Sequence, residues 1–175
     1  MSLRWIPNIA ADRPRLRMNL AYRATTRLSL GLEYNPLADE VVPIFNFAAV
    51  LPGEYYEGVG VVAGLSSDRI GTPRGYAWFG TVSLDATAWT SLPLSGYAGF
   101  SFGTFEDELK PIVGASWQFS DRVSAGFQHD GENLHWIGSY GLGEWGPGDA
   151  LWQADLLVIE QEGFHTLGAT LSTRF

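Results

Sequence analysis

The stretch Arg27–Pro36, RLSLGLEYNP, shows the pattern that decides the fold. Its residues alternate between an apolar set and a polar or small set: Leu28, Leu30, Leu32 and Tyr34 against Arg27, Ser29, Gly31 and Glu33. Alternation with a period of two predicts a β-strand with two different faces. The preceding stretch, residues 16–23, alternates in the same way, so the two are expected to form a hairpin with a tight turn at residues 24–26.

The same alternation continues to the end of the chain. Regular strands are expected at residues 76–85, 94–103, 113–119, 123–128 and 166–175, and less regular ones at 42–50, 56–65, 134–142 and 151–159. Pro43 weakens the first of the less regular strands, because proline cannot donate a ladder hydrogen bond. No window has helical spacing. This gives eleven strands from Leu16 onward, and residues 3–9 could add a twelfth.

Successive strands joined by short turns predict an all-β fold, an antiparallel up-and-down transmembrane β-barrel of about 10 to 12 strands. Eight strands, or a soluble β-barrel, are the alternatives. No linker or change in composition divides the chain, so residues 1–175 are expected to form a single domain, with residues 1–14 as a first strand or an amino-terminal extension. Alternating short and longer connections suggest a barrel whose two ends face different environments.

Composition excludes several classes of function. The 175 residues contain no cysteine, which removes disulfides, thiolate catalysis and thiolate metal sites. Eleven basic and nineteen acidic residues give a net charge of −8, and Lys110 is the single lysine, so no nucleic-acid partner is expected. The start, MSLRWIPNIAADRPR, shows no signal peptide, and no stretch is long and apolar enough for a transmembrane helix.

The two predicted faces are unlike those of a water-soluble barrel. The polar face consists mostly of Gly, Ser, Thr and Gln, with fewer charges than a solvated surface carries. Small polar residues suit a lumen, whereas the Leu, Val, Phe, Tyr and Trp of the other face suit lipid. The residues expected to line the lumen are Arg17, Arg23, Arg27, Glu33, Asp85, Gln118, Gln128 and Asp155. Among bulkier residues, Phe79, Tyr97, Ile137 and Leu157 are expected to point inward as a partial plug.

The carboxy-terminal segment TLGATLSTRF, which alternates and closes on Phe175, resembles the last strand of bacterial outer-membrane β-barrel proteins. RLSLGLEYNP and FSDRVSAGFQ are similar to the strands and short periplasmic turns of that class. The resemblance implies a location in the bacterial outer membrane, with membrane lipid and the outer-membrane assembly machinery as partners. It also implies that Phe175 is the assembly signal.

Clusters of reactive residues are few. The acidic run at residues 106–108, with Asp130, Glu132 and Glu160, could bind a divalent cation, but a solvated acidic rim is the simpler interpretation. His129 and His135 flank one turn, where histidines more often face water than bind a metal. His165 and Thr166 are adjacent, so in a strand they point to opposite faces and cannot form a catalytic pair. No catalytic residue, metal or cofactor is therefore predicted.

The sequence thus predicts a non-enzymatic outer-membrane barrel that acts as a narrow pore for small solutes or ions, or as an envelope scaffold. One alternative is a soluble β-barrel that binds an apolar small ligand, which would need the small polar face on the outside. The other is a barrel-embedded hydrolase acting on lipid or polysaccharide.

Overall fold

The computed structural model describes residues 1–7, 16–36, 39–67, 75–104, 107–145, 151–161 and 164–174. These residues form twelve strands and one short 3₁₀ helix. The strands are β1 (Ser2–Trp5), β2 (Leu16–Arg23), β3 (Leu28–Asn35), β4 (Glu40–Val50), β5 (Val59–Ser67), β6 (Tyr76–Asp85), β7 (Leu94–Gly103), β8 (Glu108–Gln118), β9 (Val123–His129), β10 (Leu134–Trp145), β11 (Leu151–Gln161) and β12 (Phe164–Arg174). The helix is η1 (Ala86–Ala88). No helix among the described residues is long and apolar enough to cross a membrane.

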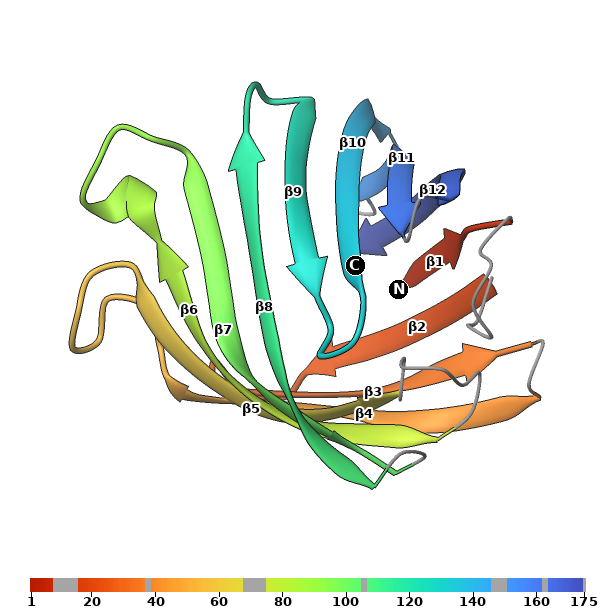
Figure 1. Cartoon of the computed structure of the whole chain (residues 1–175), viewed down its shortest axis with the longest axis horizontal. Helices are drawn as coiled ribbons and strands as arrows, with labels where there is room; N and C mark the ends of the chain where they lie inside the picture. Colours follow the sequence, from red (N-terminus) through yellow and green to blue (C-terminus); the bar gives the residue numbers. More distant parts are fainter. Residues whose placement is uncertain are drawn as a thin grey trace.

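The strands form one closed antiparallel barrel in which each strand pairs with its neighbours in the chain. The short strand β1 closes the ring, because Leu3 pairs with Met18 of β2 on one side and with Leu171 of β12 on the other. The amino group of Met1 donates a hydrogen bond to the carbonyl of Thr173 (3.0 Å), so the beginning of the chain lies beside β12 (Figure 1). The predicted up-and-down barrel is confirmed with twelve strands, and the eight-strand alternative is wrong.

The up-and-down order gives the barrel two ends. The proximal end carries Met1 and the connections 24–27, 51–58, 86–93 and 119–122, and the distal end carries the connections 36–39, 104–107 and 130–133. The longest of the connections expected at the distal end, residues 66–75, lies mostly outside the described residues, so the expected division into a short-turn end and a long-loop end stays a prediction.

Two strands accommodate proline because the barrel leaves part of each strand paired on one side only. Pro43 of β4 pairs with Leu32 of β3, but the β4–β5 ladder begins only at Phe45. Pro111 of β8 pairs with Phe100 of β7, and the β8–β9 ladder begins only at Val113. A missing N–H is tolerated where no neighbouring strand would accept it.

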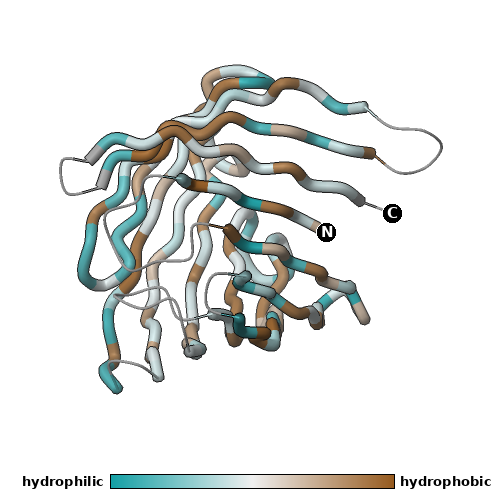
Figure 2. The backbone as a smooth tube through the Cα atoms, turned by 90° about the vertical axis from the view of Figure 1, so that its right-hand side faces the viewer, coloured by the Kyte–Doolittle hydropathy of each residue, from teal (hydrophilic) through white to brown (hydrophobic). Residues whose placement is uncertain are grey.

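The barrel has an apolar outside. Among the described residues, thirty-three large hydrophobic side chains are exposed, whereas five hydrophobic residues are buried. The largest fully buried side chain is the carboxylate-bearing Glu33, 2% exposed, while its strand neighbour Leu32 is 52% exposed. Hydrophobic and hydrophilic residues alternate along the strands in Figure 2. The soluble alternative required the small polar face on the outside, and the structure places that face inside.

Exposed aromatic side chains gather toward the two ends of the strands. Near the distal end lie Trp5, Tyr34, Tyr76, Trp78 and Trp136, and near the proximal end Tyr22, Trp89, Trp117, Phe119 and Trp145. Between them the exposed side chains include Leu20, Leu32, Val82, Leu156 and Val158. An aliphatic band between two aromatic girdles is typical of transmembrane barrels.

Candidate functional site

A cavity of about 880 Å³ lies inside the proximal half of the barrel. Glycine, alanine and serine make up more than half of its lining residues and come mainly from strands β6 to β9, and the connection 51–58 and helix η1 border the cavity. Its larger or polar lining residues include Glu57, Asp85, Tyr97, Phe127, Gln128 and Ile137. The volume is many times the roughly 30 Å³ that one water molecule occupies in the liquid, so the space can hold a hydrated solute.

A second cavity of about 370 Å³ lies further toward the distal end. Its lining is more polar and includes Asn19, Glu33, Asn46, Ser67, Thr81 and Asp130. Tyr97 and Gln128 belong to the lining of both cavities. These two side chains therefore lie where the cavities approach each other.

Strand register places Tyr97 and Gln128 on either side of one glycine. Gly114 of β8 pairs with Tyr97 of β7 and with Gln128 of β9. The Tyr97 ring lies over Gly114, because a Cβ atom added to that glycine would be 2.6 Å from ring atom Cε1. Phe79 lies over Gly64 in the same way, with its Cζ atom 2.6 Å from such a Cβ. Glycine thus makes room for two inward aromatic rings against the wall.

A buried ion pair stands beside the distal cavity. Nη1 of Arg17 lies 3.9 Å from Oε1 of Glu33, and both side chains are at least nine-tenths buried. The hydroxyl of Ser67 donates a hydrogen bond to the same carboxylate. A buried charge is tolerated only when it is paired and hydrogen-bonded, and Glu33 meets both conditions.

Part of the lumen is filled by hydrophobic side chains. Ile6, Leu157 and Ile159 form a buried cluster, and the half-buried Ile137 packs against it. These residues come from β10, β11 and the segment after β1. The cluster thus fills part of the interior between β10, β11 and the segment after β1. A further cavity of about 370 Å³, lined by residues that include Ser2, Asn19 and Gln153, lies at the proximal end on the same side of the barrel.

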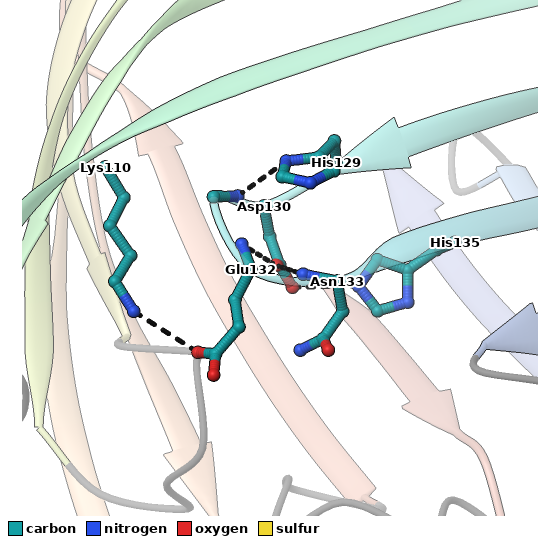
Figure 3. Close-up of polar contacts among 7 residues, drawn as sticks. Lys110, His129, Asp130, Glu132, Asn133 and His135 are labelled. Atoms are coloured by element: carbon teal, nitrogen blue, oxygen red, sulfur yellow. Dashed lines mark hydrogen bonds and ion pairs between the residues drawn. The ribbon is translucent and has the colours of Figure 1, made fainter.

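The distal turn between β9 and β10 holds a second buried polar pair (Figure 3). Nε2 of His135 lies 2.8 Å from Oδ2 of Asp130, and both side chains are more than nine-tenths buried. Oδ1 of Asp130 accepts hydrogen bonds from the backbone N–H groups of Glu132 and Asn133, which fixes the turn. Lys110 reaches across from β8 to Glu132 (3.2 Å). The Asp130–His135 pair therefore orders the turn. Its hydrogen bonds compensate for the water that these polar groups lose on burial.

The proximal rim is tied by an exposed ion pair. Nη2 of Arg27 donates to Oε1 of Glu54 at 2.6 Å, and the N–H of Leu51 donates to the other carboxylate oxygen. The hydrogen bond from Arg27, and then that from Leu51, lowers the pKa of Glu54 below its ordinary value. The same hydrogen bond to Glu54 raises the pKa of Arg27.

The lumen-lining candidates from the sequence fall into two groups. Arg17, Glu33 and Gln128 lie in the barrel interior, and the half-buried Asp155 accepts a hydrogen bond from Gln153 on the same strand. Asp85 also lines the proximal cavity, at the end of β6, where it caps η1. Arg23, Arg27 and Gln118 instead lie at the proximal ends of strands, where Gln118 donates to the carbonyl of Ser120. Phe175, the proposed assembly signal, lies outside the described residues.

Sequence reasoning expected Tyr97 to point inward but did not connect it with Gln128. The two residues are 31 positions apart, and only the register of three strands brings them to one level of the barrel. The one local signal in the sequence is Gly114, which lies between them in the register and among other small residues. A glycine at such a position leaves space for a large side chain on a neighbouring strand.

The described residues contain no group of three or more histidine, cysteine or acidic side chains arranged to hold a metal ion. Glu106 of the acidic run lies outside the described residues. His165 is exposed and Thr166 is buried, as expected for neighbours on opposite faces of β12.

In comparisons with known proteins, no family model, curated protein or solved structure matches this chain.

Proposed function

We propose that the chain is an integral outer-membrane β-barrel that acts as a narrow pore for small solutes or ions. The observation that carries the proposal is the inverted distribution of polarity: thirty-three large hydrophobic side chains are exposed, and the largest fully buried side chain is Glu33. In water, so many exposed apolar side chains would be an aggregation hazard. In a bilayer the same surface is stabilised by contact with lipid.

Closure of the barrel supports the membrane location. Backbone N–H and C=O groups in hydrocarbon must be paired within the protein, which a closed barrel achieves without a free edge. The β1 strand, paired with both β2 and β12, removes the edge that would otherwise remain. The aromatic side chains at both ends match the positions of the two membrane interfaces.

Two lumen cavities, which approach each other at Tyr97 and Gln128, favour the pore. A second candidate is an envelope scaffold that does not conduct. The buried cluster of Ile6, Leu157 and Ile159 favours this candidate, because it fills part of the interior. A measurement of conductance distinguishes the pore from the scaffold.

The test begins with refolding into detergent micelles and, separately, into plain buffer, followed by gels of boiled and unboiled samples. Detergent-refolded protein is then added to a planar lipid bilayer. We expect a heat-modifiable band in detergent alone and discrete conductance steps in the bilayer. A heat-modifiable barrel that inserts without conductance would favour the scaffold. A folded, monodisperse protein in plain buffer would contradict the membrane proposal altogether.

A further inference from the structure

The charges that line the two cavities have one sign. Glu57 and Asp85 line the proximal cavity, and Glu33 and Asp130 line the distal one. Among the described lining residues of both cavities there is no lysine, arginine or histidine. These two cavities therefore offer carboxylates and neutral dipoles to a solute.

The two pairs of carboxylates differ in their surroundings. Glu33 is buried beside the guanidinium of Arg17, and Asp130 is buried and hydrogen-bonded to the imidazole of His135. The hydrogen bonds of Asp85 come from Thr87, which carries no charge. Asp85 and Glu57 lie close in space, because the N–H of Asp85 donates to the carbonyl of Gly58 (2.8 Å). Among the lining carboxylates, Asp85 and Glu57 are therefore the ones that an ion entering the cavity from the proximal end meets first.

We propose that Tyr97 and Gln128 form the neck of a cation-selective path through the barrel. The inference rests on the proposed pore and specifies its solute class as small monovalent cations, including small ammonium ions. Carboxylates at a mouth with low-dielectric walls raise the local concentration of cations. At the neck, the face of an aromatic ring and the oxygen of an amide both stabilise a cation that has lost part of its water.

Because the Tyr97 ring lies over Gly114, substitutions at these two positions are expected to change single-channel conductance in opposite directions. Tyr97→Ala removes the ring and is expected to raise single-channel conductance about twofold or more. Gly114→Ala adds a Cβ atom 2.6 Å from the ring, which must then move toward the lumen, and conductance is expected to fall by about half or more. The double variant Tyr97→Ala with Gly114→Ala has no ring to displace, so its conductance should return to that of Tyr97→Ala.

Gly80→Ala is the matched control, because a Cβ atom added at Gly80 meets nothing within 4 Å. It should leave conductance unchanged. All variants are first checked for a heat-modifiable band, so that only folded barrels are compared. A fall in conductance in Gly114→Ala that persists in the double variant would overturn the neck, since the effect would then come from the wall and not from the ring.

Selectivity is measured as the reversal potential in a KCl gradient of about tenfold. We expect it to have the sign of the potassium equilibrium potential and to move toward zero in Asp85→Asn. Asp121→Asn removes the same charge from a proximal turn outside the cavity lining and should move it less. Conductance with anion selectivity, or with no response to Tyr97→Ala, would overturn this inference and leave the pore standing. A folded, inserted barrel without conductance, in wild type and in Tyr97→Ala, would overturn the pore itself.

Discussion

Glu33 shows how a single residue can depend on the barrel around it. Its carboxylate is buried, accepts the hydroxyl of Ser67 and lies 3.9 Å from Arg17. Glu33→Gln keeps the shape of the side chain and removes the charge, so the attraction between this carboxylate and the buried guanidinium of Arg17 is lost. We expect the free energy of unfolding to fall by about 3 kcal/mol. Urea titration of the barrel in lipid vesicles, followed by tryptophan fluorescence, measures the change.

The matched control for this prediction is Glu132→Gln. Glu132 also forms an ion pair, since Nζ of Lys110 lies 3.2 Å from its Oε2, but the side chain of Glu132 is 52% exposed. An exposed ion pair contributes little, so the loss should be under about 1 kcal/mol. Equal losses of unfolding free energy in Glu33→Gln and Glu132→Gln would show that burial does not determine how much Glu33 contributes to stability.

The exposed pair of Arg27 and Glu54 is predicted to make a contribution to stability that depends on pH. Because Arg27 and Leu51 donate to the carboxylate, the pKa of Glu54 in the folded protein is below its ordinary value of 4.5. A lowered pKa means that the contribution is complete above pH 4.5 and is lost as pH falls through the folded value. We expect Glu54→Gln to be less stable than wild type at neutral pH and equal to it at strongly acidic pH.

Urea titrations at the two pH values test this expectation. Glutamine can still accept the hydrogen bond from Leu51, so the comparison isolates the charge. A difference between Glu54→Gln and wild type that grows as the pH falls would contradict the assignment of the lowered pKa to this pair. Added salt should reduce the difference at neutral pH, because the pair is exposed.

At the scale of the strand, alternation alone was sufficient to predict the all-β barrel and most strands within a few residues. It could not predict where each strand ends, because a strand and the first residues of a turn can share one alternating pattern. For this reason Arg27, expected in the lumen, lies instead at the proximal rim, and Asp85 lines the cavity at the very end of its strand. Their partners, Glu54 and Thr87, are in connections whose shape alternation does not specify.

The register between strands was also beyond the sequence. The row of Tyr97, Gly114 and Gln128 exists only for one pairing of β7, β8 and β9. A slip of one residue would turn a strand's inward side chains to the outside. The apolar and polar faces determine which residues of each strand point inward. They do not exclude a shift of two residues in the pairing of neighbouring strands, because such a shift keeps the same residues inward. The neck between the cavities therefore needed the structure.

The outward face of one strand can be tested with a single charge. Leu32 lies near the middle of β3, is 52% exposed and pairs with Leu20 and Pro43 of the adjacent strands. In a bilayer, Leu32→Arg places a guanidinium in the apolar band and should lower the free energy of unfolding by about 2–4 kcal/mol. Urea titration in lipid vesicles provides the measurement.

Thr26→Arg serves as the control for Leu32→Arg, because Thr26 is an exposed residue of the proximal turn next to the same strand. Its cost should be close to zero, since an arginine there can reach water. If Leu32→Arg were as harmless as Thr26→Arg, the exposed leucines would not be in contact with hydrocarbon, and the proposed membrane location would fail.

At the scale of the whole molecule, the barrel depends on one of its shortest elements. β1 spans Ser2–Trp5, yet it pairs along its length with β2 and with β12. Without it, two long strands would have unpaired backbone groups, and in the proposed membrane location each such group would cost several kcal/mol in hydrocarbon. Closure therefore links the apolar exterior to the small polar interior. Because the ring pairs its backbone polar groups within the wall, it can expose apolar side chains outside and keep charged side chains inside.

This closure can be tested with an engineered disulfide, because the chain has no cysteine of its own. Leu3 and Leu171 are register partners in β1 and β12, and antiparallel partners have Cα atoms about 4.5–5.5 Å apart, within the range of a disulfide. Under mild oxidation of the folded barrel, Leu3→Cys with Leu171→Cys should cross-link and change the mobility of the boiled chain on a non-reducing gel. Leu3→Cys with Leu167→Cys places the second thiol about 13 Å further along β12 and should remain reduced. Cross-linking of the second pair in preference to the first would mean that β1 closes the barrel in another register, and failure of both in a heat-modifiable barrel would mean that β1 is not in the wall.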